Sequence, residues 1–240
     1  MQLYDMHSHI LPEIDDGSDS VETSVKMLEC LKKQGVTNIC FTPHFYTNEM
    51  SAEAFVEKRT ESFQKLKPHI PKGINVVLGG EVYVTRYLFS NDDLSGLTYG
   101  NSKYILTEHG YGSHFSEHTM SYFIKLKENF GLNCVLPHVE RYTELMHDPA
   151  IIRELQDMGV VIQTNISRYT KETSFLKKRK MIKLINDGLI DVIGTDAHSF
   201  SHNSPQLYTE ALAFIEEKCG SQIVKKMMSN AEKIFSDALS

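Results

Sequence analysis

Short runs of apolar residues alternate along the chain with segments that carry apolar residues every three or four positions. The runs are four or five residues long and rich in β-branched side chains, a composition that is typical of buried strands. They predict seven strands, at 3–6, 38–42, 75–79, 104–107, 133–136, 160–163 and 191–194. The strands are therefore spaced along the whole length of the chain.

Helical patterns lie between these strands, and residues that favour helix ends mark their limits. Apolar residues over 21–31 recur at helical spacing after a Ser/Asp-rich start, and Gly35 is expected to end this helix. Asp148-Pro149 predicts the start of another helix, which Gly159 ends. A further pattern over 181–188 also closes on a glycine.

The alternation of strands and helices predicts parallel strands that are joined by right-handed crossovers. Such a chain folds as an α/β barrel or as a doubly wound sheet, and both stay open at this point. No linker, repeat or low-complexity segment interrupts the 240 residues, of which 41% are hydrophobic. This length and composition suffice for one substantial core, so we expect a single domain over residues 1–240.

Charge and cysteine content narrow the range of partners. The net charge of −6 and the absence of a long basic block argue against nucleic acid or an anionic membrane as the main partner. The short basic run "KKRK" at 177–180 is expected on a solvated helix face. No segment resembles a signal peptide or a membrane span, and the four scattered cysteines are typical of reduced thiols. We predict a cytoplasmic protein without a membrane span.

Side chains that commonly bind metals follow six of the seven predicted strands. They are His7, His9, His44, Glu81, Glu108, His138, Asp196 and His198. In a barrel, the C-terminal ends of the strands meet at one mouth, so residues that are distant in sequence come together. Each residue alone has a structural explanation as a packed histidine or a cap. A buried group of carboxylates, however, needs a counter-charge, which a polyvalent cation supplies.

The spacing of these residues suits a shared metal site. The His-x-His at 7–9 and the Asp-x-His at 196–198 each place two ligands on the same side of a strand end. Asp16, in the "DDG" segment, adds a ninth candidate, and Gly17 is expected to permit the turn of that loop. Imidazoles and carboxylates without thiolates favour Mn, Fe or Zn over calcium. Because nine candidates exceed the four or so ligands of one zinc ion, we predict two or three ions that share a bridging carboxylate.

Taken together, the motifs resemble the PHP (polymerase and histidinol phosphatase) superfamily of metal-dependent phosphoesterases. Within it, the chain is most similar to the bacterial protein-tyrosine phosphatases associated with capsule and exopolysaccharide synthesis. The shared motifs occur in order over almost the whole chain: "DMHSHILPEIDDGS", "TPH", "GGE", "TE", "PHVERY" and "TDAH". The combination of "HSHILPEIDDG" with "HVERY" is typical of the phosphatase branch.

This resemblance implies a distorted (β/α)7 barrel with a trinuclear centre, usually activated by manganese, whose ligands are the nine residues named above. It also implies that Arg141 contacts the phosphoryl group, and we predict that His44 and Glu108 take part in catalysis as well as in metal binding. Relatives can carry another arginine shortly after the last metal-binding histidine. At that place this chain has His202 and Asn203 instead.

The function that the resemblance implies is hydrolysis of phosphotyrosine by attack of a metal-activated hydroxide. The expected substrate is the tyrosine-rich tail of a bacterial tyrosine kinase that controls capsule synthesis. A small-molecule phosphatase such as histidinol-phosphate phosphatase is an alternative that would use the same metals. A metal-dependent amidohydrolase usually has a lysine between its metals, and no lysine follows a predicted strand here. A non-catalytic metal-binding module is a third alternative.

A cysteine-dependent phosphatase is disfavoured. That chemistry requires an arginine six positions after the nucleophilic cysteine, and none of the four cysteines meets this requirement. The sequence also lacks a phosphate-binding P-loop, a GxSxG motif and an HExxH motif.

Overall fold

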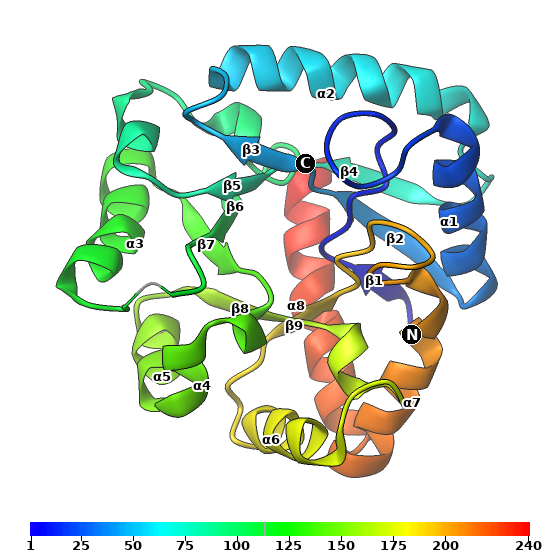
Figure 1. The fold of residues 1–240 in the computed structure, drawn as a ribbon, viewed down its shortest axis with the longest axis vertical. Coiled ribbons are helices and arrows are strands. Elements are labelled where there is room, and N and C mark those ends of the chain that lie inside the picture. Colours follow the sequence, from blue (N-terminus) through cyan, green and yellow to red (C-terminus); the bar gives the residue numbers. More distant parts are fainter. Residues whose placement is uncertain (113) are drawn as a thin grey trace.

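The computed structural model describes residues 1–112 and 114–240, and within them nine strands alternate with helices (Figure 1). The strands are β1 (Leu3–Asp5), β2 (Val36–Phe41), β3 (His44–Tyr46), β4 (Asn75–Leu78), β5 (Glu81–Tyr83), β6 (Tyr104–Glu108), β7 (Asn133–Leu136), β8 (Val161–Asn165) and β9 (Val192–Gly194). The α-helices are α1 (Val21–Lys33), α2 (Ala52–Leu66), α3 (Glu117–Phe130), α4 (Thr143–His147), α5 (Ala150–Asp157), α6 (Phe175–Asn186), α7 (Tyr208–Cys219) and α8 (Ser221–Leu239).

All strand pairings in the described residues are parallel, and they form two sheets, in the orders β1-β2-β4 and β3-β5-β6-β7-β8-β9. The seven predicted strands are present. The two additional strands, β3 and β5, continue β2 and β4 after breaks at Pro43 and at Gly79-Gly80. The backbone N–H of Glu81 donates to the carbonyl of Pro43 over 2.9 Å, which keeps the two chains side by side through the break.

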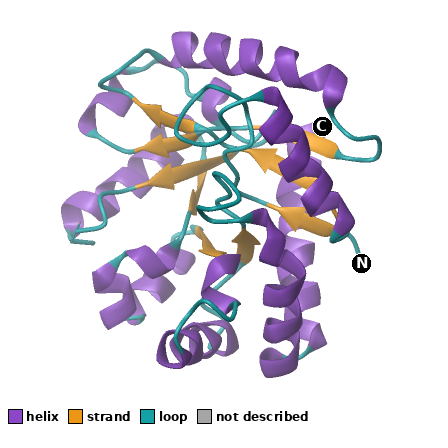
Figure 2. Cartoon of the chain, turned by 45° about the vertical axis from the view of Figure 1, so that its right-hand side comes forward, coloured by secondary structure: helices purple, strands orange, loops and turns teal. Residues whose placement is uncertain are grey.

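The first and last strands also lie side by side. The backbone N–H of Asp196 donates to the carbonyl of His7 over 2.7 Å, and Ser8 and Ala197 form an isolated parallel bridge. The strands thus occupy the centre of the molecule with helices around them (Figure 2). The predicted α/β architecture with parallel strands is confirmed, and the strands are divided between two sheets. Closure of these strands into a (β/α)7 barrel stays a prediction.

The helix ends follow the predicted signals. Ser20 caps α1 through a hydrogen bond from the N–H of Thr23, and Gly35, which follows the helix, has φ +82°. The Asp148 carboxylate accepts a hydrogen bond from the N–H of Ala150 at the start of α5. Most of "KKRK" is exposed on α6, as predicted. In the part of the chain that is described, none of the helices combines the length and the apolar character that crossing a bilayer requires.

Candidate metal centre

The nine predicted metal-binding side chains meet at one end of the strands. His7 and His9 follow β1, His44 begins β3, Glu81 begins β5, Glu108 ends β6, His138 follows β7, and Asp196 and His198 follow β9. Their donor atoms form four groups, each with all atoms within 4.8 Å of one another: His9, Asp16, His44 and His198; His7, Glu81 and His138; His7, His9 and Asp196; and His44, Glu81 and Glu108. We call this set of nine residues the His/carboxylate cluster. Its role in metal binding stays a prediction.

Glu81 lies at the middle of the cluster and is only 1% exposed. Its Oε1 atom lies 2.7 Å from Nε2 of His138 and 3.4 Å from Nε2 of His7. Its Oε2 atom lies 3.0 Å from Nδ1 of His44 and 3.3 Å from Nε2 of His9. Each carboxylate oxygen therefore faces two imidazoles, which is the arrangement that a bridging carboxylate requires.

Asp196 divides its two oxygens between different neighbours. Its Oδ1 atom faces the cluster and lies 3.2 Å from Nε2 of His7. Its Oδ2 atom accepts hydrogen bonds from Arg141 and from the side-chain amides of Asn165 and Asn203, the last two over 2.8 Å each. These donors hold one oxygen and leave the other directed at the imidazoles.

Several buried nitrogen and oxygen atoms of the cluster make no hydrogen bond of suitable geometry among the described residues, although some of them lie close to one another. They are Nε2 of His7, Nε2 of His9, Nδ1 of His44, Oε2 of Glu81 and Nδ1 of His138. Burying a polar atom without a partner costs about 1–3 kcal/mol. A cation placed between the imidazoles and carboxylates would satisfy most of these atoms at once, so the donor set fits divalent metal ions.

The charges within the cluster favour a positive centre. Burial alone would lower the pKa of His7, but the neighbouring carboxylates of Glu81 and Asp196 outweigh it and raise that pKa to about 9. Burial alone would raise the pKa of Glu81 and of Asp196, but the nearby imidazoles, His7 first, hold both well below their usual range. The same field that favours protonated imidazoles also attracts a cation.

Two residues that the sequence did not single out orient the histidine rings. Asp15 Oδ2 lies 2.8 Å from Nδ1 of His9 and also accepts a hydrogen bond from the backbone N–H of His44 over 2.9 Å. Thr42 Oγ1 lies 2.7 Å from Nδ1 of His7. In both histidines, the bonded Nδ1 leaves Nε2 directed at the cluster, which is how partners behind metal-binding histidines usually act.

Gly17 was expected to permit a turn of the loop, but its φ angle is not positive. A glycine is needed here for a different reason, which is lack of space for a side chain. A Cβ atom at this position would lie 2.2 Å from the carbonyl oxygen of His9, so only glycine allows the loop to pack against that residue. This packing brings Asp16 over the cluster, where its Oδ1 lies 3.5 Å from Nε2 of both His44 and His198. The Asp16 side chain is 71% exposed.

The substitution Asp15→Asn is expected to weaken metal binding about tenfold, because loss of the carboxylate behind a metal-binding histidine typically lowers affinity by about 10–100-fold. Titration of the metal-stripped protein with Mn²⁺ measures the effect as a dissociation constant. The control is Asp92→Asn, at an exposed carboxylate in the loop after β5. Equal affinity in the two variants would show that Asp15 does not support the cluster through His9.

Arg141 lies at the edge of the cluster, at the end of the short helix η4 (Val139–Arg141). One of its amino groups pairs with Asp196, and the other donates to the Tyr111 hydroxyl over 2.9 Å. That hydroxyl in turn donates to Glu108 over 2.5 Å. Asn203 donates to the same oxygen of Asp196 as Arg141 does. Tyr111 is a further residue of the site that the sequence did not indicate.

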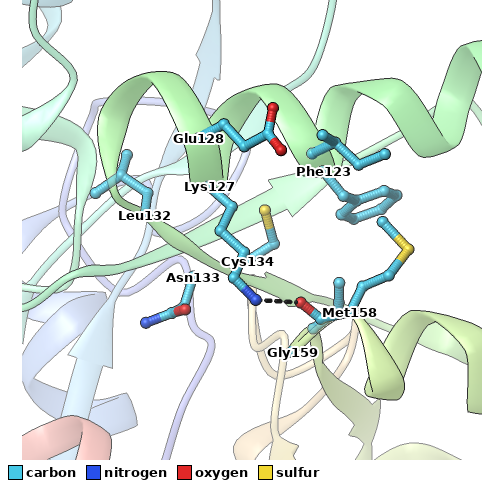
Figure 3. A pocket seen from close by; sticks show the side chains of 10 residues that line it. Phe123, Lys127, Glu128, Leu132, Asn133, Cys134, Met158 and Gly159 are labelled. Carbon is cyan, nitrogen blue, oxygen red and sulfur yellow. Dashed lines mark hydrogen bonds between the residues drawn. The ribbon is translucent and has the colours of Figure 1, made fainter.

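A separate cavity of about 280 Å³ lies between α3 and the N-terminal ends of β7 and β8 (Figure 3). Its lining includes Phe123, Leu132 and Met158, and Lys127 donates a hydrogen bond across it to the Met158 carbonyl over 2.8 Å. None of the nine cluster residues lines it. It lies at the opposite ends of the strands from the cluster and has no part in that site.

Comparison with known proteins identifies the family. The model of the family described as "Capsular polysaccharide synthesis, CpsB/CapC" matches residues 3–236. This chain belongs to the CpsB/CapC family. The predicted relation to capsule-associated phosphatases is thereby confirmed at the level of the family.

Known relatives match almost the whole length of the chain. Tyrosine-protein phosphatase CpsB of Streptococcus pneumoniae is 29% identical over 252 residues, which span 99% of this chain and 100% of the relative. Tyrosine-protein phosphatase YwqE of Bacillus subtilis is 28% identical and covers 97% of this chain and 91% of its own length.

Solved structures agree with this assignment. A structure from the study of YwqE of Bacillus subtilis and CpsB of Streptococcus pneumoniae, described as unique metal-dependent tyrosine phosphatases, superposes with a TM-score of 0.83 at 26% identity. It covers 98% of this chain and 95% of the other chain. The phosphotriesterase homology protein of Escherichia coli, at 15% identity and a TM-score of 0.64, covers 98% of each chain and shares the fold.

Proposed function

We propose that this CpsB/CapC family member is a metal-dependent protein-tyrosine phosphatase, a phosphoric monoester hydrolase. Relatives named tyrosine-protein phosphatases extend over at least 97% of its length, and the matching structure comes from a study of metal-dependent tyrosine phosphatases. The observation that carries the proposal is the His/carboxylate cluster around Glu81, with its buried nitrogen and oxygen atoms that make no hydrogen bond of suitable geometry among the described residues.

We propose that the cluster holds two or three divalent ions, manganese first, with iron or zinc as alternatives. The four groups of donors overlap at His7, His9, His44 and Glu81, so neighbouring ions would share ligands. When bound, such ions make hydroxide available near neutral pH and neutralise phosphoryl oxygens. Phosphate-monoester hydrolysis is extremely slow without such help.

We propose that residues at the edge of the cluster bind the phosphoryl group. Arg141 presents a planar guanidinium that binds two phosphoryl oxygens at once, as a lysine cannot. Tyr111 holds one of its amino groups in place through the 2.9 Å hydrogen bond. Asn203 offers a neutral amide at the position where an arginine can stand in relatives. We assign His44 and Glu108 to catalysis through their places in the cluster.

The rim of the site favours an aromatic leaving group. The Tyr46 ring stacks on His44 with 5.4 Å between centroids, and Tyr83 lies next to it at 5.7 Å. The Tyr111 ring lies 5.7 Å from that of His138. Aromatic side chains on the rim offer stacking partners to the phenyl ring of phosphotyrosine. This supports a phosphotyrosine substrate over histidinol phosphate.

We propose as the partner a phosphorylated bacterial tyrosine kinase of capsule synthesis, which agrees with the name of the family. We also infer that residues 1–240 act as one domain, because a single cluster of buried apolar residues extends from Tyr4 to Ala238. The cytoplasmic location stays a prediction.

A comparison of substrates tests the proposed function. With Mn²⁺ added, we expect kcat/KM for a phosphotyrosine peptide to exceed that for histidinol phosphate at least about tenfold, since a pocket that fits one substrate commonly discriminates by about 10–200-fold. A preference for histidinol phosphate would instead identify a small-molecule phosphatase. Turnover of neither compound with Mn²⁺, Fe²⁺ or Zn²⁺ would contradict phosphatase activity altogether.

A further inference from the structure

A surface cavity with a volume of about 310 Å³ lies next to η4, outside the His/carboxylate cluster. It is lined by Glu140, Met146, Arg168, Lys177, Lys180 and Met181. We call it the α6 groove, because three of these residues belong to α6. Glu140 directly precedes Arg141, so the groove begins beside the residue that we assign to the phosphoryl group.

The only carboxylate among the residues that line the groove is turned inward. The Glu140 side chain is 4% exposed. It accepts hydrogen bonds from Thr164 over 2.9 Å, from the backbone N–H of Asn165 over 3.2 Å and from Nε of Arg168 over 3.3 Å. Because Arg168 balances the charge of Glu140, the net positive charge that the groove presents to solvent comes from Lys177 and Lys180.

The segment that forms the groove is strongly basic in an acidic protein. Residues 166–186 contain seven of the 25 basic residues and only one of the 31 acidic residues of the chain. Phe175 and Leu176, at the start of α6, are 73% and 74% exposed. Exposed apolar side chains therefore directly precede Lys177, the first lysine of the groove, in the sequence.

We propose that the α6 groove binds an acidic segment of the phosphoprotein substrate, next to the phosphotyrosine at Arg141. Acidic side chains of that segment pair with Lys177 and Lys180, and its apolar side chains contact Phe175 and Leu176. A local basic surface is needed because the net charge of −6 repels an acidic partner. The inference rests on the proposed phosphatase function and adds the substrate class that the site selects.

The shape of the surface favours a peptide over an anionic membrane. Lys177 and Lys180 line a concavity together with Met146 and Met181, of which Met181 is 3% exposed. A lipid surface is flat and would contact only the outer edge, whereas an extended peptide can enter the groove. Glu140 lines the groove and is the chain neighbour of Arg141, so a segment that flanks the phosphotyrosine would extend toward the groove.

Two phosphotyrosine peptides that differ only in their flanking residues, Asp/Glu in one and Asn/Gln in the other, test this inference. With the Mn²⁺-loaded wild-type protein, we expect a higher kcat/KM for the acidic peptide. The double variant K177E/K180E is expected to lower kcat/KM for that peptide about tenfold, mainly through KM, because two surface charges are reversed. Turnover of p-nitrophenyl phosphate, which does not reach the groove, is expected to stay unchanged.

The matched control is K32E/K33E, at two exposed lysines where α1 ends. These lysines precede β2 and therefore lie at the opposite ends of the strands from the cluster. This control is expected to leave both peptides and p-nitrophenyl phosphate unaffected.

Each alternative result has a distinct meaning. Equal use of the two peptides by a wild-type protein that hydrolyses p-nitrophenyl phosphate would overturn the docking inference and leave the phosphatase function intact. A wild-type protein that hydrolyses none of the three compounds overturns both. If K177E/K180E keeps the peptide preference but loses binding to phosphatidylserine vesicles, the basic surface is a membrane contact and the inference is wrong.

Discussion

Replacing Glu81 with glutamine is expected to lower kcat at least about 100-fold and to reduce the metal content of the protein. Glutamine has nearly the same shape but lacks the negative charge that faces four imidazoles of the cluster. Removing one partner from a buried charged pair costs about 3–5 kcal/mol, and about 1.4 kcal/mol corresponds to a factor of ten. The loss is therefore expected to exceed that from any substitution at the rim of the site.

Two measurements check this prediction: turnover of an aryl phosphate at saturating Mn²⁺, and metal bound per chain by mass spectrometry. Glu57→Gln, at an exposed carboxylate on α2, serves as the control and is expected to match the wild type in both. A Glu81→Gln variant that retained full metal content and activity would remove Glu81 from the centre of the site.

Arg141→Lys is expected to lower kcat/KM for phosphotyrosine peptides about 10–100-fold, which corresponds to the loss of a charge-assisted hydrogen bond. Lysine keeps the positive charge but lacks the planar guanidinium group that binds two phosphoryl oxygens at once. Because Arg141 is not among the nine ligands, the variant is expected to bind as much metal as the wild type. This separates its effect from that of Glu81→Gln.

The control for this prediction is Arg153→Lys, at an exposed arginine on α5 that bonds to the Asp187 carbonyl. It is expected to leave kcat/KM unchanged. If Arg141→Lys also leaves kcat/KM unchanged, or if it loses metal along with activity, then Arg141 does not bind the phosphoryl group in the way that we propose.

The cluster was predictable from the sequence because short apolar runs predict where strands end, and the candidate ligands directly follow those runs. The His-x-His at 7–9 and the Asp-x-His at 196–198 each follow a run that predicts a strand, and parallel strands bring such ends together. The strands β3 and β5 were not predictable in the same way. Each is only three residues long and directly follows Pro43 or Gly79-Gly80, which are typical of turns.

The residues that support the cluster could not be predicted because they act across long sequence separations. Thr42 contacts His7 across 35 positions, and Tyr111 contacts Arg141 across 30. A threonine or a tyrosine has no spacing that indicates such a contact. Asp15 had a weak signal, since it stands next to the predicted ligand Asp16, but only the fold shows that its carboxylate faces His9.

The central claim is that nine residues from distant parts of the chain hold shared metal ions. Anomalous diffraction from crystals of the protein, stripped with chelator and reloaded with Mn²⁺, tests it most directly. We predict two or three ions within the His/carboxylate cluster, at least one of them in contact with Glu81. A protein that is fully active after stripping, with no anomalous peak among these nine side chains, would contradict the claim.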